Sequence, residues 1–178
     1  MHRKELIQLL ENYAPTNGQE IAYKQLILDF ITHHPDCFDR SCEIGHITGS
    51  AWLLNKDHSK VLLMHHVKLN KWFQLGGHCD ANSDVLAVAI KEAQEESGIE
   101  HIEPVKTGIY DIDIHLIPAK GNIKAHYHYD VRFLLHVTSD EQVVQNHESR
   151  ELRWIGKNRS ELPTDNPSVV RMFEKWAS

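Results

Sequence analysis

The sequence predicts an α/β protein in which a mixed β-sheet is covered by helices on both faces, with a helical extension at the N-terminus. Apolar residues recur at helical spacing near both ends of the chain, and short runs rich in β-branched and aromatic residues fill its middle. A chain of 178 residues suits one domain with a sizeable core and a small appendage. Helices before, between and after the strands indicate a layered architecture.

The N-terminal part is expected to hold two helices. The leucines of the first run and Tyr13 lie at helical spacing, and a second apolar-rich run covers residues 21–31. We therefore expect residues 1–43 to form a helical extension and residues 44–178 to form the main domain.

The central part is expected to supply most of the strands. Three short runs there favour strands and are separated by turns containing Asn, Asp and Lys. The runs are HITGSAWLL (residues 46–54), KVLLMHHV (60–67) and KWFQL (71–75). The stretch GGHCDANS (76–83) is then expected to be a polar loop, and a helix is expected from about Asp84 to Ser97.

The rest of the chain is expected to add three strands and a last helix. The strands are placed at about residues 106–117, 124–137 and 152–155. Asn166 and Pro167 form the N-cap and first position typical of a helix start, and Val169, Phe173 and Trp176 supply its apolar side.

Composition excludes several classes of protein. The formal net charge of -6 argues against a broad nucleic-acid surface, because phosphate backbones are held mainly by clustered Lys and Arg. No stretch approaches the roughly 18 uninterrupted apolar residues of a membrane span, and the N-terminus lacks the apolar core of a signal peptide. Three cysteines without a CxxC pair fit a reducing compartment. We therefore expect a cytoplasmic protein that binds neither a membrane nor a nucleic-acid polymer.

Three glutamates are crowded into the stretch KEAQEESGI (residues 91–99). Glu92, Glu95 and Glu96 are related by i, i+3 and i+4, so on a helix their carboxylates lie on one face. Like charges this close destabilise a helix unless a cation neutralises them, and Mg²⁺ or Mn²⁺ prefers such oxygen ligands. Taken alone, the cluster is more simply a solvated acidic face supported by a Lys91–Glu95 pair.

The surrounding sequence points to the metal site instead. From Gly77 the chain runs GHCDANSDVLAVAIKEAQEESGI. This resembles the Nudix box, in which G, five residues, E, seven residues and R-E-U-x-E-E-x-G-U follow one another, with U aliphatic. The matching positions are Gly77, Glu92, Ala93, Glu95, Glu96, Gly98 and Ile99. So many fixed positions form a specific signal. The resemblance to the Nudix hydrolase family, carried by Gly77 to Ile99, implies that family's α/β/α sandwich for residues 44–178.

Two positions depart from the family pattern. The first glutamate of the box is Ser83 here and its arginine is Lys91, and in the family these two residues tie the loop to the helix. Asp84 or Asp80 is the expected substitute partner of Lys91, although a lysine makes a single-point contact where an arginine makes a fork. Neither change removes a carboxylate that is expected to hold metal.

The resemblance implies a hydrolase that cleaves a diphosphate linkage in a nucleoside diphosphate-linked or related small molecule. Carried over by position, Glu92, Glu95 and Glu96 are the expected catalytic residues and Mg²⁺ ligands, with Mn²⁺ as the alternative ion. The Gly76 carbonyl is expected to complete the ligand set. Glu96 is the first candidate ligand, and Glu92 either binds metal or acts as a base.

Two other functions share the expected fold. One is a ligand-binding or regulatory module that does not hydrolyse its ligand, and the other is a diphosphate isomerase. The complete carboxylate set favours the enzyme over the binding module, and the protonation machinery of an isomerase is not evident. The N-terminal helices either cap the substrate site or form a homodimer interface, and the sequence does not decide between these roles.

A second polar face is expected on the hairpin of the two long strands. Alternation places Asp111, Asp113 and His115 on one face of the first strand and a matching set on the next. That set, the candidate substrate-binding residues, is His126, His128, Asp130 and Arg132. A turn closed around residues 119–122 would set His115 opposite His126.

Two interpretations of this face stay open. The plainer one is a solvated outer face, since alternation alone shows only that one side is less buried. The sharper one is that the face borders the catalytic cleft and supplies substrate contacts, a general base or a second metal site of His and Asp. Glu148 and Glu151, near the late strand, are reserve candidates for the base. His78 is expected to be a packing or surface residue rather than a ligand.

Overall fold

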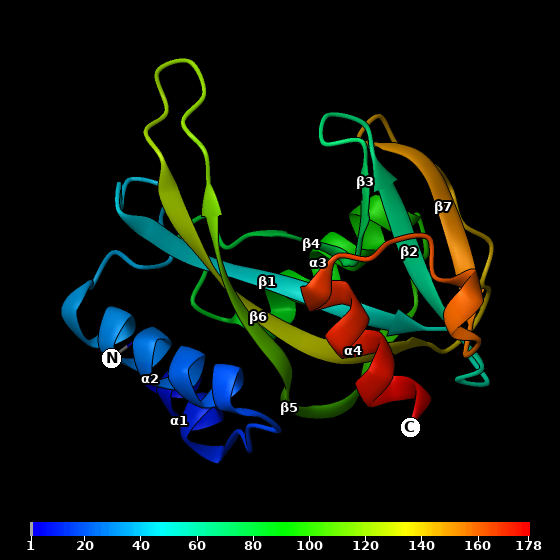
Figure 1. The fold of residues 1–178 in the computed structure, drawn as a ribbon, viewed down its shortest axis with the longest axis horizontal. Coiled ribbons are helices and arrows are strands. Elements are labelled where there is room, and N and C mark those ends of the chain that lie inside the picture. Colours follow the sequence, from blue (N-terminus) through cyan, green and yellow to red (C-terminus); the bar gives the residue numbers. More distant parts are fainter. Residues whose placement is uncertain (1) are drawn as a thin grey trace.

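The computed structural model describes residues 2–178. Two helices open the chain, α1 (Lys4–Asn12) and α2 (Gly18–His33), as expected. The remaining elements, in chain order, are β1 (Gly45–Leu54), β2 (Lys60–His66), β3 (Lys71–Phe73), β4 (Leu75–His78), α3 (Val85–Ser97), β5 (Ile102–Ile117), β6 (His126–Val137), β7 (Ser149–Gly156), the 3-10 helix η1 (Arg159–Glu161) and α4 (Pro167–Ala177). Figure 1 shows the long β5–β6 hairpin projecting beyond the rest of the sheet.

The helix boundaries follow from local capping. The Asp84 carboxylate accepts a hydrogen bond from the Ala87 amide at 3.0 Å and starts α3, which ends at Gly98 with a left-handed φ of 73°. Asn166 accepts hydrogen bonds from the first amides of α4, and Pro167 needs no partner for its nitrogen. Both predicted helix starts are confirmed.

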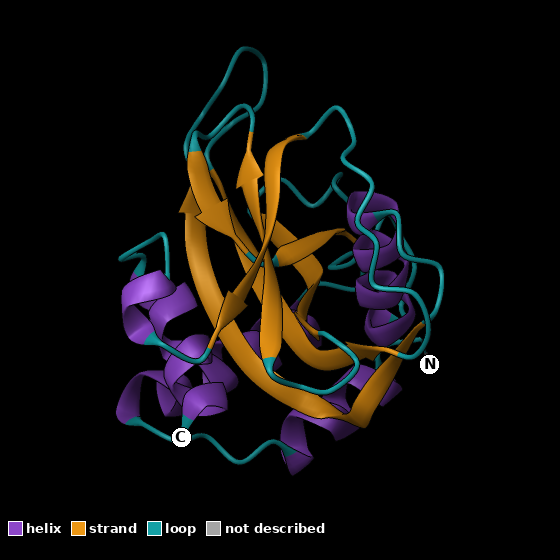
Figure 2. Ribbon diagram, turned by 90° about the vertical axis from the view of Figure 1, so that its right-hand side faces the viewer, coloured by secondary structure: helices purple, strands orange, loops and turns teal. Residues whose placement is uncertain are grey.

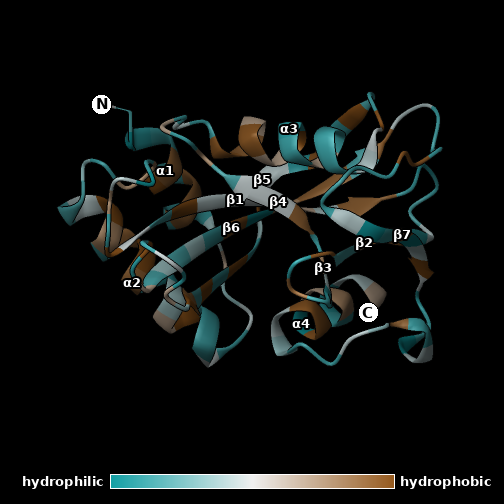
Figure 3. Ribbon diagram, turned by 90° about the horizontal axis from the view of Figure 1, so that it is seen from above, coloured by the Kyte–Doolittle hydropathy of each residue, from teal (hydrophilic) through white to brown (hydrophobic). Residues whose placement is uncertain are grey.

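The strands form a mixed sheet of seven strands in the order β3-β2-β1-β6-β5, with β4 paired to β1 and β7 paired to β2. Strands β1 and β6 run parallel, and the other pairs are antiparallel. The register of β1 with β2 is the single pair Leu54 and Val61, so the sheet divides into two halves that meet at this point. Helices α3 and α4 lie on opposite sides of the strands (Figure 3), and Figure 2 shows helices on both sides of the sheet. The expected mixed sheet with helices on both faces is confirmed.

Two apolar clusters hold these layers together. The larger one joins α1, α2 and α3 to one face of β1, β5 and β6, and the smaller one packs α4 on the other face through Trp52 and Phe173. Phe30 of α2 stacks on Tyr129 of β6 with ring centroids 4.0 Å apart. The N-terminal helices therefore share the core of the sheet. A domain boundary at residues 43 and 44 stays a prediction. None of the helices within residues 2–178 has the length and apolar character needed to cross a bilayer.

The stretch predicted as a polar loop begins with a strand. Residues Leu75 to His78 form β4 and pair with residues 48–51 of β1. A Cβ on Gly76, which has a φ of 152°, would lie 2.7 Å from Cα of Ser50, so only glycine lets the two strands approach this closely. The prediction was wrong for residues 76–78, because a pair of glycines is typical of a turn and also of close backbone packing, while residues 79–83 do form a loop.

The register predicted for the hairpin was wrong by two residues. Lys120 and Ile123 pair across a two-residue turn, which places His115 opposite His128 and Asp113 opposite Asp130. The turn is centred one residue later than expected because Gly121 takes up the left-handed conformation, with a φ of 59°. A shift of two preserves the alternation of faces, so the polar sides of the two strands still meet.

Candidate active site

Glu96 is the most deeply buried of the three glutamates on α3. Only 5% of its surface is exposed, and its Oε2 accepts a hydrogen bond from the Gly76 amide at 2.8 Å. Burial, together with the charges of Glu92 and Glu148, raises the pKa of Glu96 to about 8. Within residues 2–178, no cationic side chain forms an ion pair with Glu96. A buried carboxylate without a cation is costly, so the donor set fits a divalent metal ion with oxygen ligands.

Glu92 lies beside the same strand, whereas Glu95 is turned away from it. A Cβ on Gly77 would lie 2.5 Å from Cδ of Glu92, so the missing side chain of Gly77 makes room for this carboxylate. Burial raises the pKa of Glu92 as well. Glu95 faces solvent and pairs with Lys91 at 3.2 Å. The structure therefore brings Glu92 and Glu96 together with the glycines of β4 and leaves Glu95 at the rim.

Of the two reserve candidates for the base, Glu148 is the one whose charge reaches the buried carboxylates. It contributes to the raised pKa of both Glu92 and Glu96. Its main chain is tied to the neighbouring loop, because its carbonyl accepts a hydrogen bond from the Val67 amide at 2.8 Å. Glu151 instead forms an exposed ion pair with Arg153 at 2.6 Å.

The loop between β4 and α3 is held by the N-terminal segment. Arg40 donates two hydrogen bonds to the Asp80 carboxylate, at 2.5 and 2.9 Å, and the Ala81 amide donates to the Phe38 carbonyl at 3.0 Å. The expected pairing of Lys91 with Asp80 or Asp84 was wrong, because Arg40 occupies the first carboxylate and the second caps α3. Arg40 and Asp80 are more than half exposed, so their pair contributes at most about 1 kcal/mol to stability. No pattern in the sequence indicated Arg40.

The polar face of the hairpin is buried at its three aspartates and Arg132, so the solvated interpretation was wrong for this part of the face, whereas the side chain of His115, nearer the turn, is 42% exposed. Asp111 is 0% exposed and Arg132 is 1% exposed. The Arg132 guanidinium lies 2.9 Å from Asp111, 2.7 Å from Asp130 and 3.5 Å from Asp113. Asp130 also accepts hydrogen bonds from the side chains of Thr48, Ser50 and Gln74. A substrate-binding role for Asp130 and Arg132 stays a prediction, since protein groups already occupy both side chains.

This ion-pair network extends to the helices. Arg171 and Lys175 of α4 both pair with Asp111, at 2.8 Å each, and Lys175 reaches Glu20 of α2 at 2.7 Å. Burial disfavours the ionised form of Glu20, but hydrogen bonds from Lys175, Thr16 and Tyr13 outweigh it and lower the pKa to about 2. The network thus joins α2, β5, β6 and α4. No motif in the sequence indicated its helical members Glu20, Arg171 and Lys175, because their spacing along the chain is not periodic.

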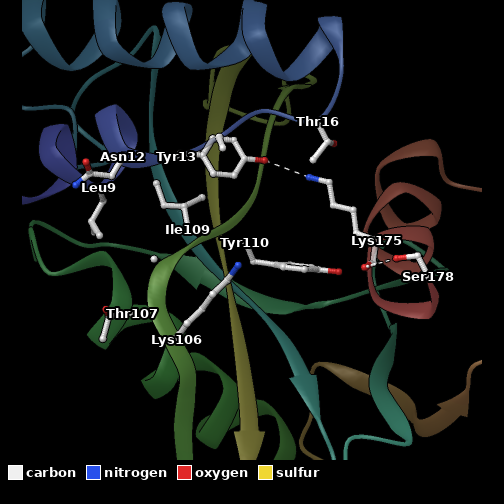
Figure 4. Close-up of a pocket in the computed structure, with 12 residues that line it drawn as sticks. Leu9, Asn12, Tyr13, Thr16, Lys106, Thr107, Ile109, Tyr110, Lys175 and Ser178 are labelled. Carbon is white, nitrogen blue, oxygen red and sulfur yellow. Dashed lines mark hydrogen bonds between the residues drawn. The ribbon is translucent and has the colours of Figure 1, made fainter.

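Two cavities flank this network. The smaller, of about 250 Å³, lies between α2, the β3–β4 connection, β5 and the start of α4. Its lining residues are Gln19, Tyr23, Phe73, Gln74, Asp113, Ile114, His115, Arg132, Asn166, Pro167, Ser168 and Arg171. Since Gln74 stands two residues before Gly76, this cleft adjoins the strand that contacts Glu96. The larger cavity, of about 610 Å³, lies around Tyr13, Tyr110 and Lys175 (Figure 4), and none of its lining residues belongs to β4 or α3.

The fold agrees with the comparisons to known proteins. The NUDIX domain family matches residues 46–175. No curated protein sequence matches the chain. A solved hydrolase of the NUDIX family from Clostridium perfringens is 26% identical, with a TM-score of 0.56, over 74% of this chain and 95% of that one. A C. elegans Ap4A hydrolase is 18% identical over 74% and 94% of the two chains, with a TM-score of 0.58.

A third solved structure, a UDP-X diphosphatase, is 11% identical, with a TM-score of 0.55 over 98% of this chain and 91% of that one. At this level of identity the likeness concerns the fold alone, and it includes the region of the N-terminal helices. The family match covers most of the described chain. The protein therefore belongs to the NUDIX domain family, and its class is that of the Nudix-type hydrolases.

Proposed function

We propose that this protein hydrolyses a diphosphate linkage in a nucleoside diphosphate-linked or related small molecule, with Mg²⁺ or Mn²⁺ as cofactor. The observation that carries the proposal is the buried Glu96, with Glu92 beside it and a glycine amide as its hydrogen-bond donor. Glu92, Glu96 and the Gly76 carbonyl would hold the ion, and Glu95 would join after leaving Lys91. Bound metal would neutralise charge on the phosphate groups during the reaction.

Glu148 is the best-supported general base outside the α3 helix. Its charge acts on both Glu92 and Glu96, so its carboxylate lies close enough to the proposed metal site to take a proton from attacking water. Glu148 is also anchored on both sides, because its amide donates a hydrogen bond to Asn146 and its carbonyl accepts one from Val67.

The 250 Å³ cleft is the proposed site for the organic part of the substrate. It combines the aromatic rings of Tyr23 and Phe73 with several amide side chains, a lining that suits a nucleobase or sugar next to the phosphates. Helix α2 supplies Gln19 and Tyr23 to this lining, which favours the role of the N-terminal helices as a cap over that of a homodimer interface. The solved relatives named for Ap4A and UDP-X agree with this substrate class.

The buried thiols support a cellular location, and the net charge supports a class of substrate. Cys37, Cys42 and Cys79 are buried free thiols, which supports a reducing, cytoplasmic location. The net charge of -6 supports a small-molecule substrate rather than a nucleic-acid polymer.

A panel of diphosphate compounds, assayed with Mg²⁺, with Mn²⁺ and with EDTA, tests the proposal. We expect turnover that EDTA abolishes. Glu148→Gln should lower kcat by about 10²- to 10⁴-fold, the usual contribution of a general base, while Glu151→Gln, the matched control, should stay close to wild type. Tight binding of a compound without turnover would instead support the ligand-binding module. Equal rates in the two variants would remove Glu148 as the base.

A further inference from the structure

Five histidines gather at the base of the β5–β6 hairpin, on the face of the sheet opposite α3. This histidine cluster consists of His46 on β1, His78 on β4, His115 on β5, and His126 and His128 on β6. The neighbouring rings have centroids between 4.8 and 5.4 Å apart. His115 also lines the 250 Å³ cleft, but none of the five forms a hydrogen bond or an ion pair with the glutamates of α3 within residues 2–178.

Three of these histidines converge on one point. His46, His78 and His128 each offer a ring nitrogen, and the three atoms lie within 4.8 Å of one another. Strand pairing fixes this arrangement, since His46 stands opposite His128 in the parallel β1–β6 ladder and His78 pairs with Thr48, two residues further along β1. The ligand positions are therefore set by three strands of a rigid sheet.

The inner rings lack hydrogen-bond partners. His46 is 4% exposed, and neither of its ring nitrogens makes a hydrogen bond with any group in residues 2–178. Nε2 of His128 is buried without a partner in the same way. Buried polar atoms are normally paired, and unpaired ones call for an explanation such as a bound ion.

We propose that His46, His78 and His128 form a binding site for a transition-metal dication of the Zn²⁺ type. Imidazole nitrogens suit Zn²⁺ and its neighbours, whereas Mg²⁺ prefers oxygen. Three imidazoles bound to one tetrahedral ion at about 2.0–2.1 Å have ring centroids about 5 Å apart. The three centroid distances in this structure are 5.0, 5.0 and 4.8 Å. His126, whose ring centroid is 5.0 Å from that of His46, or a water molecule completes the coordination.

The proposed site is separate from the carboxylates but shares a strand with them. The side of Gly77 faces Glu92, and strand alternation turns the next residue, His78, to the opposite face of the sheet. A metal ion bound by the three histidines would cross-link β4 to β1 and β6, two residues after Gly76 in β4. The site therefore binds metal independently of Glu96 while steadying the strand that contacts Glu96.

Co²⁺ titration followed by visible absorption tests the proposal on the full chain, because four-coordinate Co²⁺ absorbs far more strongly than six-coordinate Co²⁺. We expect one strongly absorbing Co²⁺ per chain, displaced by one equivalent of Zn²⁺. The band should persist in Glu96→Gln, which removes a charge from the carboxylate site. It should be lost in His46→Leu and in His128→Gln, and be retained in His101→Asn, an exposed histidine outside the cluster.

Thermal unfolding gives a second readout. Because each protein is compared with itself in the presence and absence of Zn²⁺, the readout also works for a variant whose own stability has changed. Zn²⁺ at a hundredfold excess over its Kd should raise the Tm of the wild type by about 5–10 °C, and it should leave the Tm of the two cluster variants unchanged. Absence of a strongly absorbing Co²⁺ in the wild type would overturn the proposal, and so would a band lost in Glu96→Gln but kept in both cluster variants. Neither result depends on hydrolysis, so a failure of the proposed histidine site and a failure of the proposed activity can be told apart.

Discussion

The charge of Glu96 should make the metal-free protein lose stability as the pH rises. The ordinary pKa of the group is 4.5, and burial raises it to about 8 in the folded protein. Between these two values this group holds more protons in the folded state than in the unfolded state, so its contribution to the free energy of unfolding falls as the pH increases. The contribution of Glu96 to stability is fully present below pH 4.5 and is lost as the pH rises through 8.

The size of the effect follows from the two pKa values. At about 1.36 kcal/mol for each unit of pKa, the whole difference corresponds to roughly 5 kcal/mol, of which about 3 kcal/mol has been lost at pH 7. That is a large share of the roughly 5–15 kcal/mol that stabilises a typical domain. Glu20 and Asp113 do not interfere, because their pKa values are lowered to about 2 and they titrate below this range. His78 and His128, whose pKa values burial lowers to about 4 and about 2, act in the opposite direction, so the effect of Glu96 is read from the difference between wild type and a Glu96 variant.

Glu96→Gln removes this penalty and keeps the acceptor for the Gly76 amide. In EDTA, urea unfolding of wild type and variant at pH 5.5 and pH 8.0 should show the variant gaining about 3 kcal/mol relative to wild type between the two pH values. Mg²⁺ should raise the stability of the wild type at pH 8.0 and have little effect on the variant. Glu95→Gln, which alters an exposed carboxylate of the same helix, is the matched control. A stability difference that does not change with pH would refute the reasoning.

Two further substitutions test the charge network and the glycine pair. Arg132→Met leaves Asp111, Asp113 and Asp130 buried without their shared cation, so the free energy of unfolding should fall by about 3–5 kcal/mol in urea denaturation; a loss below about 1 kcal/mol would mean that the network does not need this charge. Gly77→Ala would place a Cβ 2.5 Å from Cδ of Glu92. Moving a catalytic group by about 1 Å can cost about 10²-fold in rate, so kcat should drop by that order with the fold intact, while Gly108→Ala, where a Cβ meets no atom within 4 Å, should keep its rate.

Much of the fold follows from short-range patterns. Asp84, Asn166 and Pro167 fix helix starts through contacts with residues two or three positions away, and these starts are where the sequence placed them. The carboxylates of α3 are recognised in the same way, because i, i+3 and i+4 spacing places them on one face whatever surrounds the helix. The mixed sheet was predicted from its alternating and apolar runs.

Two of the errors concern pairings between distant parts of the chain, and one concerns the conformation of a single turn residue. The strand that begins at Leu75 forms because its two glycines can pack closely against residues 49 and 50 of β1. The hairpin register depends on which residue of the turn takes up the left-handed conformation. The Asp80 carboxylate is paired with Arg40, 40 residues earlier in the chain, rather than with the neighbouring helix. Such contacts leave no periodic signal in the sequence.

By itself, then, the sequence determined that Glu92, Glu95 and Glu96 share one helix face, since the spacing of the box sets this by local geometry alone, and it made them the candidates for metal binding. Only the tertiary structure decided which of the three glutamates are buried, because the burial of Glu92 and Glu96 against Gly76 and Gly77 depends on a strand pairing that no local pattern encodes. It also decided that His46, on a strand without a functional motif, meets His78 and His128. Side chains from three strands converge only when the register of the whole sheet is set.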